Sequence, residues 1–141
     1  MIIKSSKAII IVNNNYLLQL RDKKENISFP NHWGLFGGRL DDRENYLKAL
    51  KREIREETNL DVRVKRKILC VNFSIIGLKK KRNLQYFECH IVGKKKIKLS
   101  EGKKYNFFSF NQIKKLNIVP MDFVAIKTHY LNINNFISTY R

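Results

Sequence analysis

Apolar and polar positions along the chain follow patterns that predict several short strands and three helices. Runs rich in Ile, Val, Leu, Tyr and Phe, bounded by Asn, Gly or charged residues, are typical of β-strands. The predicted strands are Ala8–Asn13, Tyr16–Leu20, Trp33–Phe36 (ended by Gly37 and Gly38), Val62–Ile76, Leu84–Val92 and Tyr105–Phe110. Because Val62–Ile76 is long, we expect a bend or a bulge within it. The connections are a turn at Asn13–Asn15, a loop over Arg21–Pro30 and a hairpin tip over Gly77–Arg82.

Helical spacing of apolar residues is clearest in the middle of the chain. Leu47, Leu50 and Ile54 fall within about 60° of one another on a helical wheel, which predicts a stripe that faces the core. Pro120 suits the first turn of a helix. The predicted helices are Asn45–Thr58, Asn111–Leu116 and a closing helix that runs from Met121 to Tyr130 or beyond.

The order of these elements favours a single mixed α/β domain over residues 1–141, since no repeat, linker or low-complexity stretch interrupts them. The 43% hydrophobic and 29% charged residues are ordinary for a globular protein and exclude a disordered chain. Apolar runs such as Ala8–Val12 are far shorter than the ~20 residues that span a bilayer. No signal-peptide pattern is present at the start, so we expect a cytoplasmic protein without a membrane partner.

Cysteines and histidines are few and scattered. Cys70 and Cys89 lie in apolar, strand-like surroundings without metal-site spacing, so we expect two reduced, buried thiols. His32, His90 and His129 are far apart in the sequence, and we expect each to be structural or solvated.

The charge balance is unusual, with 29 Lys and Arg against 12 Asp and Glu and a net charge of +17. Such a surface attracts polyanions, and RNA is a candidate partner on this ground. Compositional bias toward lysine is an equal alternative, since the chain is also rich in Ile and Asn. The basic runs Lys79–Arg82, Lys94–Lys96 and Lys103-Lys104 lie at predicted strand ends or loops, where such runs are most often solvated. The charge alone does not decide between them.

Half of the 12 acidic residues fall within Asp41–Glu57. Glu53, Glu56 and Glu57 share one face of the predicted helix, where like charges at this spacing repel. They also lie toward the negative end of the helix dipole. A divalent cation would relieve both effects, and oxygen ligands favour Mg²⁺ or Mn²⁺. A solvated face paired with Arg52 and Arg55 is the alternative.

Around these glutamates the sequence resembles the box of the Nudix family, GX5EX7REUXEEXGU, where U is aliphatic. Gly38 is followed after five residues by Glu44 and after seven more by Arg52–Leu60. All spacings agree, and Asn59 alone departs, in place of the last glycine. Asn tolerates the left-handed conformation better than other non-glycine residues, so we expect the change to be harmless. Flanking segments that also resemble the family are Tyr16–Arg21, His32–Gly38 (with Phe36 where many members have proline) and Glu101–Phe110.

The resemblance implies an α/β/α sandwich with a mixed β-sheet and Mg²⁺-dependent hydrolysis of the diphosphate linkage in a nucleoside diphosphate derivative. A small nucleotide is then the partner, with a nucleoside triphosphate or a nucleotide sugar favoured. The alternatives are an RNA 5′-end pyrophosphohydrolase and a non-catalytic Nudix module that binds a nucleotide or nucleic acid. Many relatives form homodimers, and no feature of this sequence decides that point.

The resemblance also implies roles for individual residues. The implied metal ligands, for Mg²⁺ or in its place Mn²⁺, are Gly37, Gly38, Glu53, Glu56 and Glu57. The candidate catalytic residues are Glu53, Glu57, Glu101, Arg52 and Glu44. Among them, Glu53 and Glu101 are the candidates for general base, while Arg52 and Glu44 orient the glutamates. Candidate substrate-binding residues are Arg21 and Arg39 for phosphates, and Trp33 and Phe36 for a base, although a core position is the more common role for such aromatics.

Overall fold

The computed structural model describes residues 2–24, 27–74, 80–100, 102 and 104–139. The elements are β1 (Ile2–Val12), β2 (Asn15–Leu20), β3 (Trp33–Gly34), β4 (Phe36–Arg39), α1 (Tyr46–Thr58), β5 (Asp61–Ser74), β6 (Lys81–Val92), β7 (Lys104–Phe108), α2 (Phe110–Ile113) and α3 (Pro120–Thr139). Two predicted features fall outside the described residues, namely the end of a strand at Ile75–Ile76 and the hairpin tip at Gly77–Lys79.

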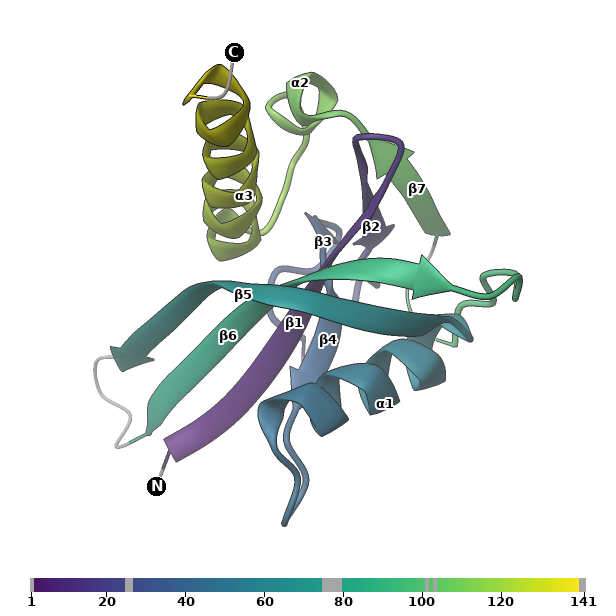
Figure 1. Cartoon of the computed structure of the whole chain (residues 1–141). Helices are drawn as coiled ribbons and strands as arrows, with labels where there is room; N and C mark the ends of the chain where they lie inside the picture. Colours follow the sequence, from purple (N-terminus) through teal and green to yellow (C-terminus); the bar gives the residue numbers. More distant parts are fainter. Residues whose placement is uncertain (1, 25–26, 75–79, 101, 103, 140–141) are drawn as a thin grey trace.

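The strands form a mixed sheet in the order β3-β2-β1-β6-β5, with β4 also paired to β1 and β7 to β2. β1 and β6 run parallel, with Ile2 opposite Lys81 and Ile10 opposite Cys89. The other pairs are antiparallel. In Figure 1, α1 covers one face of the β5-β6-β1-β4 part, and α3 lies on the opposite side. The predicted α/β/α sandwich with a mixed sheet is confirmed.

Alternate residues of β1 supply the two cores on either side of the sheet. Ala8 and Ile10 pack in one cluster with Leu50 and Ile54 of α1. Ile9, between them, packs in a second cluster with Ile126 of α3. This alternation is the period-two pattern of a strand buried on both faces.

The predicted strand Trp33–Phe36 is in fact two strands, which corrects the sequence interpretation. β3 pairs with β2, whereas β4 pairs with β1 and continues through both glycines to Arg39. The chain changes partner at Leu35, whose N–H donates to the buried Asp122 carboxylate at 2.9 Å instead of to a strand. At Gly37, which has φ +149°, an added Cβ would collide with the carbonyl oxygen of Ser6, so a glycine is required there.

Helix α1 matches its prediction closely at both ends. Asn45 is the N-cap, and its side chain accepts from the Lys48 N–H at 2.8 Å. Asn59 adopts the left-handed conformation with φ 67°, so asparagine does replace the glycine of the box at this cap. Leu47 was expected to face the core but is 45% exposed. It lies in the first turn, and burial in the core begins only with Ala49 and Leu50.

Other boundaries differ because strand pairing extends beyond the apolar runs. β1 begins at Ile2, not Ala8, since it pairs along its length with β6. For the same reason Lys81 and Arg82 belong to a strand and not to the hairpin tip. The register of β5 shifts between Val64 and Arg66 and again between Lys67 and Leu69, which confirms the expected irregularity.

The connection between β7 and α2 corrects two further boundaries. Ser109 and Gln112 form a capping box, which draws Phe110 into α2 and ends β7 at Phe108. α2 is correspondingly shorter than predicted and ends at Ile113. α3 begins at Pro120, as the proline suggested.

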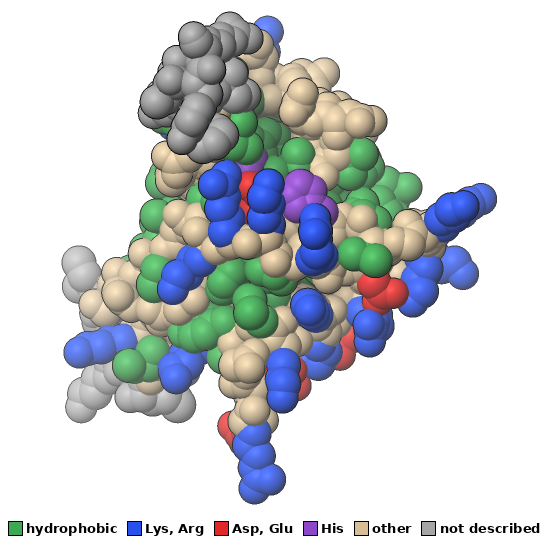
Figure 2. Space-filling model, in the orientation of Figure 1, with side chains coloured by type: hydrophobic (Ala, Val, Ile, Leu, Met, Phe, Trp, Pro, Cys, Tyr) green, Lys and Arg blue, Asp and Glu red, His purple; other side chains and the backbone are tan. Residues whose placement is uncertain are grey.

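Basic side chains spread over the face that β5 and β6 present in Figure 2. β5 is the outermost strand of the sheet and exposes Arg63, Lys65, Arg66 and Lys67. Charged side chains along an edge strand oppose pairing with another sheet. Cys70, on the same strand, is exposed, so the expectation of a buried thiol is wrong there but is confirmed for Cys89; both are free thiols.

On the α3 side of the sheet, a buried carboxylate ties the helix to the strands. Glu88 accepts from Nε2 of His129 at 2.8 Å and lies 2.8 Å from Nε2 of His90 and 3.2 Å from a guanidinium nitrogen of Arg66. Burial tends to raise the pKa of Glu88, but the hydrogen bonds from both histidines outweigh burial and hold that pKa at about 2. Burial also lowers the pKa of His129, so its ring is neutral and accepts at Nδ1 from the Tyr16 hydroxyl at 2.8 Å.

This network predicts a loss of stability in mild acid. The folded chain protonates His129 only below the ordinary histidine pKa of about 6.5, whereas the unfolded chain takes up that proton at the ordinary value. Acidification through this range therefore favours the unfolded state. Equilibrium urea denaturation at several pH values should show the free energy of unfolding falling, with a shallower fall in His129→Gln, which does not titrate. Equal slopes in wild type and His129→Gln would contradict the assignment.

No helix within the described residues is long and apolar enough to cross a bilayer.

Candidate active site

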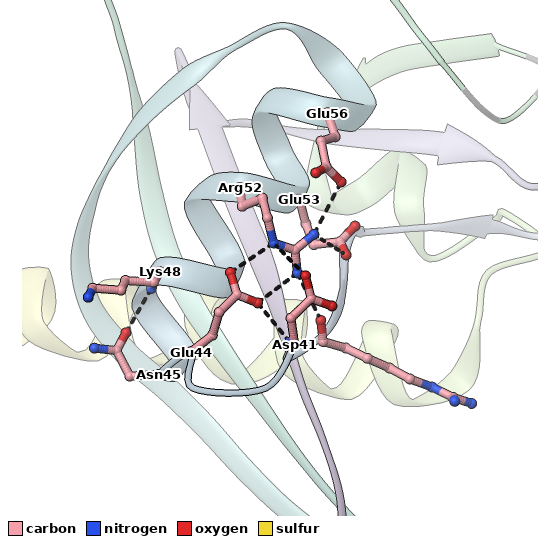
Figure 3. Close-up of polar contacts among 8 residues, drawn as sticks. Asp41, Glu44, Asn45, Lys48, Arg52, Glu53 and Glu56 are labelled. Carbon is pink, nitrogen blue, oxygen red and sulfur yellow. Dashed lines mark hydrogen bonds and ion pairs between the residues drawn. The ribbon is translucent and has the colours of Figure 1, made fainter.

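The guanidinium of Arg52 lies at the centre of the acidic cluster on α1 (Figure 3). Its Nε and one terminal nitrogen donate to the two carboxylate oxygens of Glu44 at 2.8 and 2.9 Å. The other terminal nitrogen donates to Glu53 at 3.0 Å and to Glu56 at 3.1 Å. The carbonyl of Arg39, at the end of β4, accepts a further bond at 3.1 Å. One side chain therefore fixes the helix, the preceding loop and the glycine strand relative to one another.

The pKa values in this cluster follow from the same bonds. The hydrogen bonds from Arg52, assisted by the N–H of Asp41 at 2.7 Å, lower the pKa of Glu44 to about 2. Hydrogen bonding to Glu44 raises the pKa of Arg52 above its usual value. Both groups are charged at neutral pH, and Glu44 holds Arg52 in the orientation that reaches Glu53 and Glu56.

Strand β4 comes close to α1 because it has no side chain at Gly38. A Cβ at Gly38 would lie 2.5 Å from the carboxyl carbon of Glu53 and 2.7 Å from one of its oxygens. The glycine therefore leaves room for the Glu53 carboxylate to rest against the strand. Any larger residue would push that carboxylate away from β4.

Beside Glu53 lies a pocket of about 220 Å³, which we call the acidic pocket. Its lining includes Gly37, three acidic residues and one basic residue; these four charged residues are Asp22, Glu53, Glu57 and Arg21. Glu57 is only 8% exposed. In a chain with net charge +17, a concave site with more carboxylates than cations is a local exception.

The donor set of the acidic pocket fits a hard divalent cation, because the charged ligands there are carboxylate oxygens. Glu53 and Glu57 line the pocket, whereas the 58% exposed side chain of Glu56 turns to Arg52 outside the lining. Among the described residues, no three His, Cys, Asp or Glu side chains lie close enough together to form a preformed metal site. Glu53 and Glu57 therefore face the pocket, while Glu56 lies beside it on Arg52. Glu101, the other predicted base, lies outside the described residues.

A second pocket, of about 450 Å³, lies on the α3 side of the sheet and is called the cationic pocket below. Its charged lining residues are Lys7, Arg21, Arg39, Arg82 and Asp122, and its aromatic ones are Phe29, Phe73 and Tyr86. The two pockets share Arg21, and each includes one of the adjacent glycines Gly37 and Gly38. They are therefore neighbours with opposite charge.

Asp122 organises one wall of the cationic pocket. Its fully buried carboxylate accepts from the Tyr86 hydroxyl at 2.7 Å and from the Leu35 N–H at 2.9 Å, and it pairs with Lys7 at 3.0 Å. Burial raises the pKa of Tyr86, which keeps its hydroxyl protonated as a donor. The charges of Asp122 and Lys7 cancel, so the remaining charge of this pocket is positive.

The structure separates the predicted substrate-binding residues into two groups. Arg21 and Arg39 line the cationic pocket. Phe36 is 1% exposed and packs in the core, so the expectation that it stacks on a base is wrong. Trp33 packs edge-on against Phe108, with ring centroids 4.8 Å apart, and is not among the residues that line either pocket.

Sequence reasoning missed Asp122, Lys7 and Asp22. One signal for Asp122 was available, since it is the only acidic residue after Glu101 and follows a proline at a helix start. Lys7 and Asp22 carry no comparable local signal, because only the fold brings them to these pockets.

For the hydrolysis that the resemblance of the box implies, replacing Arg52 should slow the reaction more than it weakens substrate binding. Arg52→Lys keeps the charge but loses the fork that holds Glu44, Glu53 and Glu56 together, and loss of such a supporting contact typically costs 10–100-fold. We expect kcat to fall by about this factor with a smaller change in KM, and Glu44→Gln to give a similar loss. Steady-state kinetics of the two single variants and the double variant tests this. If Arg52 and Glu44 act as one unit, the fold-loss of kcat in the double variant should be well below the product of the two single fold-losses. A multiplicative loss would contradict the arrangement.

Comparison with known proteins finds a family model and several solved structures that are similar to this chain. The family model described as NUDIX domain matches residues 4–127. The solution structure of a DNA mismatch repair protein MutT (family Nudix hydrolase) from methicillin-resistant Staphylococcus aureus 252 has 31% identity and a TM-score of 0.70, covering 90% of this chain and 94% of that one. The MutT protein from Methanosarcina mazei Go1 has 25% identity and a TM-score of 0.75, covering 95% of both chains. An Ap4A hydrolase from C. elegans, in a binary complex, has 15% identity and a TM-score of 0.73, covering 94% of this chain and 98% of that one. A comparison with curated protein sequences gives no match.

Proposed function

Because this chain belongs to the Nudix hydrolase family, we propose that it hydrolyses the diphosphate linkage of a nucleoside diphosphate derivative with the help of Mg²⁺. The favoured substrates are a nucleoside triphosphate and a nucleotide sugar. The neighbour named as an Ap4A hydrolase supports a nucleotide derivative as the class of substrate. Nudix hydrolases in general use a divalent metal, and Mn²⁺ is expected to replace Mg²⁺ here.

The observation that carries the proposal is the pair of adjoining pockets with opposite charge. The acidic pocket, with Glu53 and Glu57, is suited to a metal-bound phosphate chain. The cationic pocket, with its aromatic lining, is suited to the nucleoside. Arg21, which lines both, is placed where the two parts of such a substrate would meet.

Within the acidic pocket, Glu53 and Glu57 would hold the cation, with Glu56 and the backbone of Gly37 and Gly38 as further candidate ligands. When bound, the cation neutralises charge on phosphate oxygens and lowers the pKa of an attacking water. Arg52 and Glu44 keep Glu53 against β4, so that its carboxylate stays at the pocket wall.

The general base remains a choice between Glu53 and Glu101. A base must lie within hydrogen-bond reach of the attacking water, directly or through another water, in order to accept its proton. Glu53 lines the acidic pocket and thus meets the first condition for that role. Cleavage would then give a nucleoside monophosphate and the phosphorylated remainder, or the reverse division of the phosphates.

The cationic pocket accommodates the nucleoside through two exposed aromatic rings. Phe29, from the loop after β2, is 45% exposed, and Phe73, near the end of β5, is 38% exposed. Exposed rings in a pocket provide stacking faces for a base. Their origin in different elements means that the cavity depends on the fold and not on the box.

A substrate panel tests the proposal. Purified protein is incubated with nucleoside and deoxynucleoside triphosphates, nucleotide sugars, dinucleoside polyphosphates and a 5′-triphosphorylated RNA oligomer, with Mg²⁺ or with EDTA. Product release should require Mg²⁺ and should be fastest for a triphosphate or a nucleotide sugar. Nucleotide binding without any turnover would instead support a non-catalytic module.

A further inference from the structure

The cationic pocket crosses the sheet from β4 to β5. Gly38 and Arg39 belong to β4 at one side, whereas Arg82 belongs to β6 and Phe73 to β5 at the other. β1 separates β4 from β6, so two interstrand spacings, or roughly 10 Å, lie between the backbones at the two sides. Arg82 is therefore well removed from the strand that borders the acidic pocket.

Beyond Arg82 the surface is hollowed further. An outer pocket of about 320 Å³ is lined by Ile2, Asn72, Phe73, Ser74, Lys81 and Arg82. Phe73 and Arg82 line both this outer pocket and the cationic pocket, so the two adjoin at these side chains. A ligand in the cationic pocket can extend past Arg82 toward Lys81.

Three of the four basic residues that line the cationic pocket have no acidic partner among the described residues. Lys7 is paired with Asp122, but Arg21, Arg39 and Arg82 form no ion pair among the described residues. The Nε of Arg82 is also buried without a hydrogen-bond partner in the part of the chain that the structure describes. The Arg82 side chain as a whole is partly buried and lines both pockets, so an anionic group of a ligand bound there can pair with its charge.

The diphosphate linkage does not account for Arg82. Under the proposed function, on which this inference rests, the diphosphate lies at the acidic pocket, where Arg21 and the β4 residues border it. Arg82 lies at the opposite side of the nucleoside cavity. A second anion, bound at the nucleoside end of the substrate, would fill this role.

We propose that the substrate carries a further phosphate on its ribose, outside the diphosphate linkage, and that Arg82 binds this group. Arginine suits a phosphate because its planar fork donates two parallel bonds. The same phosphate chemistry has two sources, either a phosphomonoester on a small nucleotide or the phosphodiester that joins the next nucleotide of an RNA. Arg82 is then a specificity-determining residue that acts on the choice of substrate.

Equilibrium binding of product-like nucleotides tests this without any need for turnover. Wild-type protein should bind a nucleoside 3′,5′-bisphosphate about tenfold more tightly than the matching 5′-monophosphate, as expected for one charge-assisted contact. Arg82→Gln should lose most of this preference. The control Arg63→Gln removes one positive charge from an exposed position on β5 and should retain the preference for the bisphosphate. Melting temperatures of the three proteins check that they are folded. Equal affinity for both nucleotides in wild type, or a preference that persists in Arg82→Gln, would overturn the proposal.

A second assay distinguishes a small nucleotide from an RNA end as the source of the phosphate. It also tests the phosphate site separately from the proposed hydrolysis. Three matched 5′-triphosphates are compared by kcat/KM, with a 3′-hydroxyl, a 3′-phosphate or a 3′-phosphodiester to a second nucleotide. A higher kcat/KM for the 3′-phosphate indicates a small nucleotide as the substrate, and a higher kcat/KM for the phosphodiester indicates an RNA end. Either preference supports the role of Arg82 if Arg82→Gln abolishes that preference. Equal values for all three refute this inference and leave the proposed function standing. No turnover with a retained preference in binding refutes the proposed function and leaves the phosphate site standing.

Discussion

Glu57→Gln is expected to lower kcat by about 10²–10⁴-fold, the range that removal of an essential charged group in an active site typically gives. Glu57 is 8% exposed and lines the acidic pocket with Glu53, so its carboxylate is placed to hold a cation. Glutamine keeps the size of the side chain but brings no negative charge. The loss should therefore appear in the metal-dependent step and not in the fold.

Steady-state rates on the best substrate of the panel, across a range of Mg²⁺ concentrations, measure this effect. The matched control is Asp42→Asn, which removes an exposed carboxylate from the loop before α1 and should leave kcat within about twofold, as for most surface substitutions. Comparable activity of Glu57→Gln and Asp42→Asn would show that Glu57 has no part in the reaction.

Asp122→Ala is expected to destabilise the fold by about 3–5 kcal/mol, the usual cost of removing one partner from a buried ion pair. The carboxylate is fully buried and is the acceptor for the Leu35 N–H and the Tyr86 hydroxyl, as well as the counterion of Lys7. Alanine would leave these donors without an acceptor and would also open a cavity. Urea denaturation at equilibrium measures the change.

Two comparison variants make this prediction specific. Asp122→Asn keeps an acceptor for Leu35 and should cost less than alanine. Asp61→Ala removes a surface carboxylate that pairs with Arg55 and Lys95, and its effect should be much smaller, because exposed ion pairs contribute little. A similar loss of stability in Asp122→Ala and Asp61→Ala would contradict the structural role assigned to Asp122.

The parts of the molecule that follow from local rules were predictable from the sequence. Helix α1 and its caps depend on neighbouring residues, so the extent of the helix and the left-handed cap at Asn59 could be assigned from spacing and backbone preference. The family resemblance implied that Arg52 and Glu44 orient the glutamates, and the structure adds that these two side chains are bonded to each other.

The parts that depend on distant contacts were not predictable in the same way. The break between β3 and β4 arises because Leu35 donates to Asp122, which lies far along the chain. The cationic pocket joins β1, β4, β5, β6 and α3, and no single segment carries its pattern. Phe36 shows the same limit, since an aromatic before two glycines can stack on a base or belong to the core, and only the packing of distant residues decides for the core.

The structure shows where the excess positive charge lies on the surface. The sequence left open whether a net charge of +17 serves a partner or reflects composition. Part of it lies along the outermost strand β5, where it opposes edge pairing, and part of it lines the pocket beside the metal-binding glutamates of the proposal. Arg82 is one of the basic residues that line the pocket, so a single neutral substitution there tests whether this charge binds a ligand.

In the proposed reaction, the carboxylates of α1 hold the divalent cation that hydrolysis requires. Electron paramagnetic resonance of Mn²⁺ measures this directly, because the sharp signal of the free ion disappears on binding. Titration of wild-type protein should remove free Mn²⁺, with much weaker removal by Glu53→Gln and Glu57→Gln and a wild-type result for Asp42→Asn. Equal binding by wild type and both glutamine variants would show that these carboxylates do not form the metal site, and the account of the active site would then be wrong.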